Sequence, residues 1–187
     1  IAIGHNDLGS VKLYDSRSYN LIRTFKIDLK THRQDDTYQF FYPVQYVTLS
    51  KDGSLLAAVA IDDTISVWNT RSGEKLYSLK SQSTVSSLSF SQDSRFLVTS
   101  ALDGSLRIWN FEKKSGINIV ASRTEWINYD DEGNFDSSPN GGSLVSLRKA
   151  DQIFAIDQFA IRYNRPDIMY RKIGIGSQEQ LNHFNSQ

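Results

Sequence analysis

Apolar and polar residues alternate in short runs along much of the chain, and one such pattern occurs twice. The first copy spans residues 44–69 and the second spans residues 85–110. Alternation with a period of two is typical of a half-buried β-strand, because successive side chains point to opposite faces of the sheet. The second copy predicts three strands, at residues 85–90, 96–99 and 106–109. The repeated pattern therefore predicts an all-β chain built from similar groups of strands.

The two copies are related by a regular step. Trp68 and Trp109 lie 41 residues apart. The pairs Asp52-Gly53 and Asp103-Gly104 fall between predicted strands, where a tight turn needs residues that tolerate positive φ. A period near 40 residues with several short strands in each period is typical of a propeller blade. Each copy therefore predicts one blade.

The residues that close each copy resemble the WD-repeat family. Val-Trp-Asn at 67–69 and Ile-Trp-Asn at 108–110 are similar to the Trp-Asp dipeptide that ends a WD repeat, with Asn in place of Asp. Asp62 and Asp103, each six residues before the Trp, match the turn Asp of the family. The resemblance implies a β-propeller of WD type.

The same resemblance implies a buried polar network in each blade, which joins the turn Asp, the Trp indole, a strand hydroxyl and a His of the preceding loop. The members expected here are Thr99, Asp103 and Trp109 in the second copy, and Asp62 and Trp68 in the first. Gln82 stands at the His position of the second copy, and Ala58 replaces the hydroxyl residue of the first. Both networks are therefore expected to be incomplete.

The phase of the repeat divides the chain into six parts. We expect the end of a first blade at 1–27, an inserted loop at 28–43, a second blade at 44–80, a third blade at 81–116, a degenerate fourth blade with a helical extension at 117–175, and a flexible tail at 176–187. Residues 9–15 align with residues 104–110, and no first strand precedes them. The chain thus starts inside a repeat, which favours a fragment of a longer protein.

The inserted loop carries four aromatic residues, namely Tyr38, Phe40, Phe41 and Tyr42. Long loops are uncommon unless they are functional or disordered. Two interpretations stay open: the aromatic side chains form a patch that binds a partner, or they fold under the loop and cover the neighbouring blade.

The degenerate copy contains an acidic turn. Residues 127–135 repeat the strand, turn and strand of residues 49–55, and the turn carries Asp130, Asp131 and Glu132, with Asp136 just after it. Calcium is one interpretation of these carboxylates, but their spacing does not fit the calcium-binding loop pattern. A solvated hairpin tip fits better. A short helix is expected at 167–173, with Pro166 near its first turn.

Residues 126–139 and 157–167 carry a second resemblance. They are similar to the segment that ends the propeller of bacterial WD-repeat proteins and leads into a caspase-like peptidase domain. The catalytic His and Cys of that family lie downstream, and the chain has no Cys, so no peptidase activity carries over. Arg162, Tyr163 and Arg165 are candidate partner-binding residues at such a junction, and capping of the helix start together with Asp167 is the alternative.

Composition argues against several classes of function. Lys plus Arg and Asp plus Glu both total 21, so the formal net charge is zero and nothing favours capture of nucleic acid. The longest apolar run, residues 55–61, is too short to cross a bilayer. The three His residues, His5, His32 and His183, lie far apart in the sequence, which disfavours a metal site.

Motifs for catalysis are missing as well. No serine-hydrolase elbow, dinucleotide loop or phosphate loop occurs in the sequence. We therefore expect no enzymatic activity and no cofactor. Since no signal-peptide pattern opens the chain, we expect a cytoplasmic location.

Together these patterns predict a partial β-propeller of about three to four WD-type blades, each of four antiparallel strands, with a short C-terminal helical extension. The predicted function is a non-catalytic scaffold that binds protein or peptide and forms the regulatory or recognition part of a larger bacterial protein. The alternative is the propeller portion of a caspase-like cysteine peptidase whose catalytic domain lies outside the chain. Because a propeller needs four to eight blades to close, self-association through open blade faces is also expected.

Overall fold

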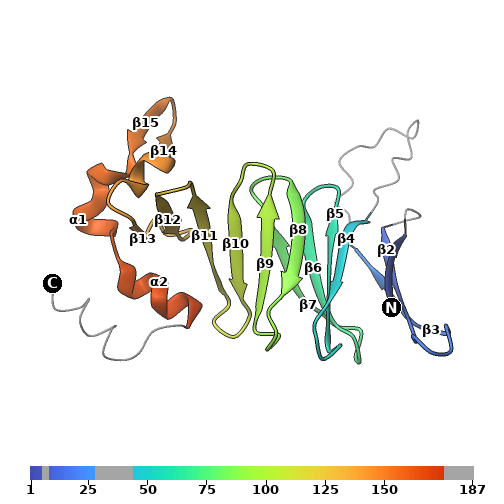
Figure 1. Ribbon diagram of the computed structural model, residues 1–187. Helices are drawn as coiled ribbons and strands as arrows, with labels where there is room; N and C mark the ends of the chain where they lie inside the picture. The colour runs from blue at the N-terminus through green and yellow to red at the C-terminus, as the bar shows by residue number, and fades with distance from the viewer. Residues whose placement is uncertain (6–8, 28–43, 175–187) are drawn as a thin grey trace, which may run out of the picture. The chain divides into compact units, whose positions relative to one another are not determined.

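The computed structural model describes residues 1–5, 9–27 and 44–174 of the chain. These residues belong to two compact units, Ile1–Ser94 and Arg95–Gln187, and each unit is described by itself. Antiparallel strands are the commonest regular structure in both units, and the helices lie near the C-terminal end (Figure 1).

Unit 1 contains the first eight strands. They are β1 (Ala2–His5), β2 (Ser10–Tyr14), β3 (Leu21–Lys26), β4 (Val44–Leu49), β5 (Leu55–Ala60), β6 (Thr64–Asn69), β7 (Lys75–Lys80) and β8 (Val85–Phe90). Two antiparallel sheets form here, one with the order β1-β2-β3 and one with the order β4-β5-β6-β7. The second sheet has the four strands expected of a blade.

The core of unit 1 lies between these two sheets. Its buried members are Val11, Leu13, Phe25, Ile27, Leu56, Ala58, Ala60 and Trp68. The rings of Phe25 and Trp68 lie 5.6 Å apart at an angle of 49°. Complete burial of one such large apolar side chain stabilises a fold by about 1.5–3 kcal/mol. The alternation seen in the sequence thus places one face of each sheet against the other.

Unit 2 holds the remaining elements. The strands are β9 (Phe96–Ala101), β10 (Leu106–Asn110), β11 (Ser115–Ala121), β12 (Trp126–Tyr129), β13 (Phe135–Ser137), β14 (Ser146–Lys149) and β15 (Gln152–Ala155). The helices are η1 (Gly141–Leu144), η2 (Ile156–Phe159), α1 (Ala160–Tyr163) and α2 (Pro166–Ile173). Strands β9 to β13 are successive antiparallel neighbours, and β14 pairs with β15.

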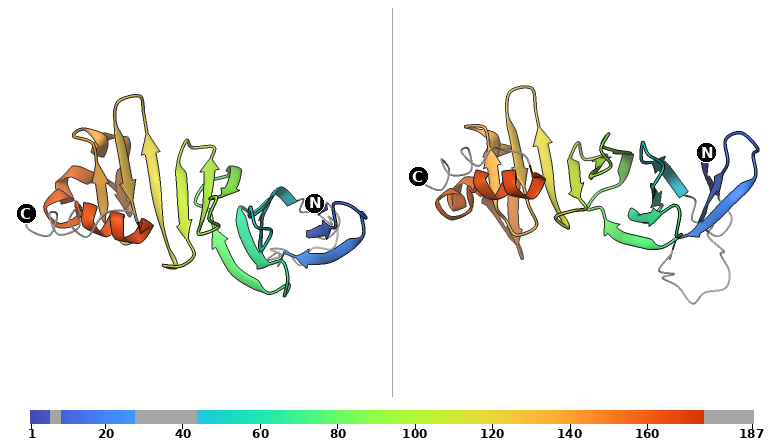
Figure 2. Two further views of the ribbon diagram at one scale, coloured as in Figure 1. Left: turned by 60° about the horizontal axis from the view of Figure 1, so that its bottom comes forward. Right: turned by 90° about the horizontal axis from the view of Figure 1, so that it is seen from below.

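The C-terminal helices lie beside the sheet of unit 2. Helix α2 is in contact with β10, β11 and β13, and Figure 2 shows it beside the sheet of unit 2. A smaller core of Ile127, Phe135 and Ile156 joins β12 and β13 to η2. Pro166 occupies the first turn of α2, as expected. Proline lacks a backbone N–H, and the N–H groups of the first turn have no partner within the helix, so nothing is lost there.

The strand, turn and strand expected over residues 127–135 are present as β12 and β13. Their hydrogen bonds extend the sheet of β9, β10 and β11, since β12 pairs directly with β11 over residues 118–121. The assignment of residues 117–175 to a fourth blade, like the other blade boundaries, stays a prediction.

The fold class is confirmed. The chain is built mainly of antiparallel sheets with a short C-terminal helix, as expected for a partial β-propeller. Within the described part of the chain, none of the helices has the length and apolar character needed to cross a membrane.

Candidate functional site

The turn Asp of the first repeat organises the connection between β5 and β6. Asp62 accepts hydrogen bonds from the backbone N–H of Thr64 at 3.0 Å and from its hydroxyl at 2.8 Å. Trp68 is buried, and the Lys75 ammonium lies 5.7 Å from the centre of its ring. Each residue therefore has a local role, and a polar network that links Asp62 to Trp68 stays a prediction.

The turn Asp of the second repeat plays the same part. Asp103 accepts hydrogen bonds from the Ser105 backbone N–H at 2.9 Å and from the Ser105 hydroxyl at 2.6 Å. Thr99 and Trp109 are both buried, yet the indole Nε1 of Trp109 has no hydrogen-bond partner among the described residues. The indole hydrogen bond expected from the family is therefore not formed. The guanidinium of Arg107 stacks over the Trp109 ring instead, 4.1 Å from its centre.

Two groups of residues were predicted from the sequence to bind a partner. The aromatic residues of the inserted loop, Tyr38, Phe40, Phe41 and Tyr42, lie outside the described residues. Arg162 and Tyr163 lie on α1, where the guanidinium is 5.3 Å from the centre of the Tyr163 ring and the Arg162 side chain is exposed. Their role in binding a partner stays a prediction.

Arg165 fixes the start of α2. Its guanidinium donates two hydrogen bonds of 2.8 Å to the buried carboxylate of Asp167, and its backbone N–H donates to the Phe135 carbonyl at 2.7 Å. These hydrogen bonds lower the pKa of the Asp167 carboxyl below its usual value, although burial opposes that shift. The contacts of Arg165 are thus a local ion pair with Asp167 and a backbone hydrogen bond that ties the helix start to β13, and a role in binding a partner stays a prediction.

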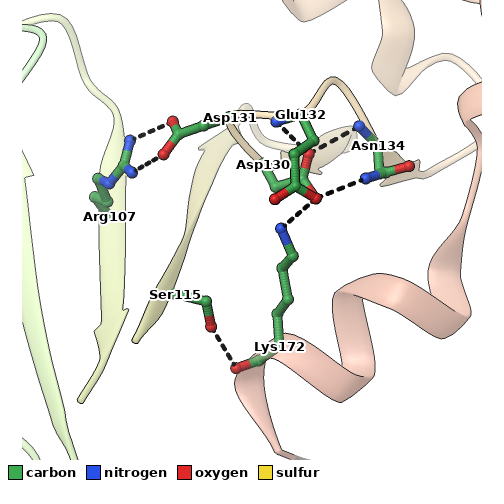
Figure 3. A network of polar contacts seen from close by, with 7 residues as sticks. All are labelled: Arg107, Ser115, Asp130, Asp131, Glu132, Asn134 and Lys172. Carbon is green, nitrogen blue, oxygen red and sulfur yellow. Dashed lines mark hydrogen bonds and ion pairs between the residues drawn. The ribbon is translucent and has the colours of Figure 1, made fainter. Parts of the chain in front are cut away.

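The other end of α2 is held by an ion-pair cluster (Figure 3). The ammonium of Lys172 lies 2.8 Å from a carboxylate oxygen of Asp130 and 2.8 Å from one of Glu132, both in the turn between β12 and β13. Asp130 is completely buried, and its remaining acceptor positions take hydrogen bonds from the backbone N–H groups of Glu132 and Asn134 and from the Asn134 amide. The acidic turn is therefore a binding site for the helix, in place of the solvated tip expected from the sequence.

The pKa values of this cluster follow from its geometry. Partial burial alone would lower the pKa of Lys172, but the carboxylates of Asp130 and Glu132 outweigh burial and raise it. Burial would raise the pKa of Asp130, but hydrogen bonds from Lys172 and Asn134 outweigh that effect and lower it. Both shifts favour the charged pair in the folded state.

Asn110, the last residue of β10, completes the attachment. Its amide donates hydrogen bonds to the carbonyl oxygens of Lys172 at 2.9 Å and Ile173 at 3.3 Å. The hydroxyl of Ser115 donates to the same Lys172 carbonyl at 3.4 Å. The last carbonyl groups of a helix lack partners within the helix and form the negative end of its dipole, so they prefer donors or cations. We call Asn110, Ser115, Asp130, Glu132 and Lys172 the helix-docking cluster.

Asn69, the equivalent residue of the first repeat, accepts hydrogen bonds with its side chain and does not hold a helix. Its side-chain oxygen accepts hydrogen bonds from the backbone N–H groups of Arg71 and Ser72, each at 2.9 Å. An Asp would accept the same bonds. Only at position 110 does the amide act as a donor, so only there does the structure require Asn. The sequence carried the signal, Asn in place of Asp, but gave no means of telling the two positions apart.

Each repeat exposes a large apolar residue directly before its turn Asp. Ile61, between β5 and β6, is 44% exposed, and Leu102, between β9 and β10, is 74% exposed. The two positions lie 41 residues apart, which is the step of the repeat. We call Ile61 and Leu102 the turn residues. Ile61 was counted in the apolar run 55–61, and Leu102 lies between the strands predicted at 96–99 and 106–109, so neither stood out in the sequence.

Comparison with protein families gives two matches. Residues 37–69 and 73–110 match the model of the WD40 family, described as WD domain, G-beta repeat. These two segments are WD repeats by this match. The matched segments end at Asn69 and Asn110, which confirms the phase of the repeat inferred from the tryptophans. Comparison with curated proteins gave no match.

The WD repeats carry a general expectation about function. Proteins with such repeats commonly serve as scaffolds for protein–protein interaction, and the repeats themselves are typically non-catalytic. The comparisons leave the origin of the chain and its association with a caspase-like peptidase open.

Proposed function

We propose that this chain is a non-catalytic scaffold that binds a protein or peptide, and that it forms the regulatory or recognition part of a larger bacterial protein. The observation that carries the proposal is the pair of turn residues. Each matched WD repeat exposes one branched apolar side chain at the same point of its structure. Single exposed apolar residues are common on proteins, but recurrence at one position of a repeat favours a shared binding role.

The surroundings of the turn residues suit recognition. Asp62 and Asp103 follow them directly and hold the adjoining turns through hydrogen bonds to Thr64 and Ser105. A loop fixed in this way on a rigid sheet loses little conformational freedom when it binds a partner. Both turn residues are therefore presented in a defined position before the partner arrives.

The test uses peptides selected from a displayed random library for binding to the whole chain. We expect the double variant Ile61→Asp and Leu102→Asp to lose these peptides, with an affinity loss of at least about tenfold, because desolvated apolar anchors contribute most of the binding energy of an interface. The matched control is Leu76→Asp, which changes a residue that is 38% exposed on β7, away from the turns. Peptides that bind the double variant as well as the unchanged chain would refute the proposal.

A second candidate function is the propeller portion of a caspase-like cysteine peptidase. It is supported by the resemblance of residues 126–139 and 157–167 to the segment that precedes such a peptidase. Ala160 and Tyr163 of the second stretch pack against the core that contains Ile127 and Phe135 of the first. The sequence of the parent open reading frame tests it. A downstream His and Cys pair would establish the peptidase class. A reading frame without such a pair would exclude this candidate and favour the scaffold function. A cytoplasmic location belongs to the same proposal.

A further inference from the structure

Strands β12 and β13 form a hairpin (Figure 1), and its two faces differ in character. On one face, Ile127 and Phe135 are fully buried and belong to the small core of unit 2. Side chains alternate along a strand, so Trp126, Asn128 and Asp136 lie on the opposite face. Asn128 is directly opposite Asp136, and Trp126 is diagonal to it. Residues in these two positions are near enough for their side chains to interact.

Two polar groups on this face lack a suitable partner. The Oδ1 atom of Asn128 is buried and accepts no hydrogen bond within the part of the chain that the structure describes. Asp136 is partly buried, and burial raises the pKa of its carboxyl, a shift that a hydrogen bond from the Ser137 backbone N–H opposes. A cation beside the carboxylate would lower that pKa instead. Both groups are acceptors, so the pair lacks a donor, and a positively charged donor suits it best.

An exposed indole lies beside this pair. Trp126 is 39% exposed, whereas Trp68 and Trp109 are 2% and 8% exposed. The Trp126 backbone is fixed on both sides, because its N–H donates to the Ser138 hydroxyl at 2.9 Å and its carbonyl accepts from the Ser138 N–H at 3.0 Å. The face of an indole attracts cations, and arginine in particular stacks on it. One hairpin face thus presents an aromatic ring, a carboxylate and a second acceptor.

We propose that Trp126, Asn128 and Asp136 form a binding site for an arginine side chain of a partner peptide, which we call the arginine site. The guanidinium stacks on the indole of Trp126 and donates hydrogen bonds to the carboxylate of Asp136. A guanidinium has five N–H donors, so one remains for the oxygen of Asn128, the cross-strand neighbour of Asp136. A lysine ammonium has no plane that can stack while it donates in a fork, so it fits less well.

The arginine site rests on the scaffold function, because it names a side chain that a partner peptide would carry. The two proposals nevertheless fail separately. The scaffold proposal depends on Ile61 and Leu102, which lie in the turns before β6 and β10, and the arginine site lies on β12 and β13. Substitution of the turn residues leaves all three side chains of the arginine site in place. Loss of binding at one location therefore does not count against the other.

The probe is the blocked peptide acetyl-Gly-Arg-Gly-amide, titrated into the whole chain at constant ionic strength. The readout is the NMR resonance of the Trp126 indole N–H, one of three such resonances because the chain has three Trp residues. A single side chain binds weakly, so we expect saturation with a dissociation constant of about 1 mM. The same peptide with Gln in place of Arg has no charge, and we expect no saturable shift. With Lys in place of Arg, we expect affinity to fall about threefold or more.

Two substitutions separate a binding role from a structural one. Asp136→Asn removes the charge and keeps the shape, and Asn128→Leu removes the oxygen that lacks a partner. We expect each to weaken binding of the arginine peptide, by about tenfold for Asp136→Asn, since a hydrogen bond to a charged group contributes about that factor. The unliganded chain should stay as stable as before or become more stable, because each change relieves the burial of an unsatisfied polar group. Asp151→Asn, at an exposed position in the turn between β14 and β15, is the matched control and should leave affinity unchanged.

The opposite results would overturn the arginine site. Equal shifts of the Trp126 resonance with the Arg and Gln peptides, or no saturable shift with either, would show that no such site exists. Equal affinity of Asp136→Asn and Asp151→Asn for the Arg peptide would remove the carboxylate from it. A fall in the urea midpoint of both Asp136→Asn and Asn128→Leu, with arginine binding unchanged, would assign the pair to the fold alone.

Discussion

Replacement of Asn110 by Asp tests how α2 is attached to the sheet of unit 2. The substitution preserves the size of the side chain and restores the residue that ends a typical WD repeat. It removes the amide that donates to the carbonyl oxygens of Lys172 and Ile173, at 2.9 and 3.3 Å. The new carboxylate replaces the amide at a position where the native Asn110 is only 3% exposed. It faces two carbonyl oxygens and the negative end of the helix dipole.

The loss of folding stability caused by Asn110→Asp follows from these contacts. A buried acceptor that loses its donor costs about 1–3 kcal/mol, and a charge on the unfavourable end of a helix adds about 0.3–1 kcal/mol. We therefore expect Asn110→Asp to lower the free energy of unfolding by about 2–3 kcal/mol. The same environment raises the pKa of the new carboxyl. Because the charged form is the disfavoured one, the penalty is complete above the raised folded pKa, shrinks as the pH falls below that pKa, and is gone below the unfolded pKa of about 3.9.

Urea unfolding measures this difference, and hydrogen exchange of the α2 amides locates it. Asn69→Asp is the matched control, because the oxygen of Asn69 only accepts hydrogen bonds, from Arg71 and Ser72, and a carboxylate accepts them equally well. We expect the control to change stability by less than about 0.5 kcal/mol. If Asn110→Asp costs no more than Asn69→Asp, or if α2 exchanges no faster in it, the amide does not hold the helix.

Three further predictions follow from unit 2. Lys172→Met leaves the buried carboxylate of Asp130 unpaired, so we expect a loss of about 2–4 kcal/mol in urea unfolding, whereas Glu132→Gln, at a side chain that is 69% exposed, costs less than about 1 kcal/mol. The pKa of Asp130 is lowered and that of Lys172 is raised. The stability from this pair is therefore lost as the pH falls below about 4 or rises above about 10, and Lys172→Met should flatten both limbs of a plot of stability against pH. Gly141→Ala places a Cβ atom on the backbone carbonyl of Trp126, which cannot rotate away as a side chain can, so the melting temperature should fall, whereas Gly53→Ala meets no neighbour and costs only the strain of its positive φ, 72°.

Local rules account for what the sequence predicted correctly. Alternation located the strands of the two WD repeats, and the pairs Asp52-Gly53 and Asp103-Gly104 fall in turns between strands, with positive φ at both glycines. Pro166 marked the start of α2 because its fixed φ and missing N–H suit a first turn. Each of these signals depends on residues a few positions apart.

Contacts between distant residues account for what the sequence left out. The bond from Asn110 to the Lys172 carbonyl spans 62 residues, and the ion pair from Lys172 to Glu132 spans 40. Nothing in the sequence near Asp130 shows that its carboxylate is buried, since the same residues suit a solvated turn. Burial arises only because α2 returns to that end of the sheet.

The way α2 is attached determines which substitutions release it. At its start, the Arg165 backbone bonds the Phe135 carbonyl; at its end, Asn110 and Lys172 bond groups of the sheet and of the acidic turn. Along the helix itself, Met169 is the one apolar residue among those that are fully buried. A helix held mainly by apolar area would tolerate polar substitutions at its two ends. Because polar contacts hold both ends of the helix, substitution of Asn110 or Lys172 should release α2.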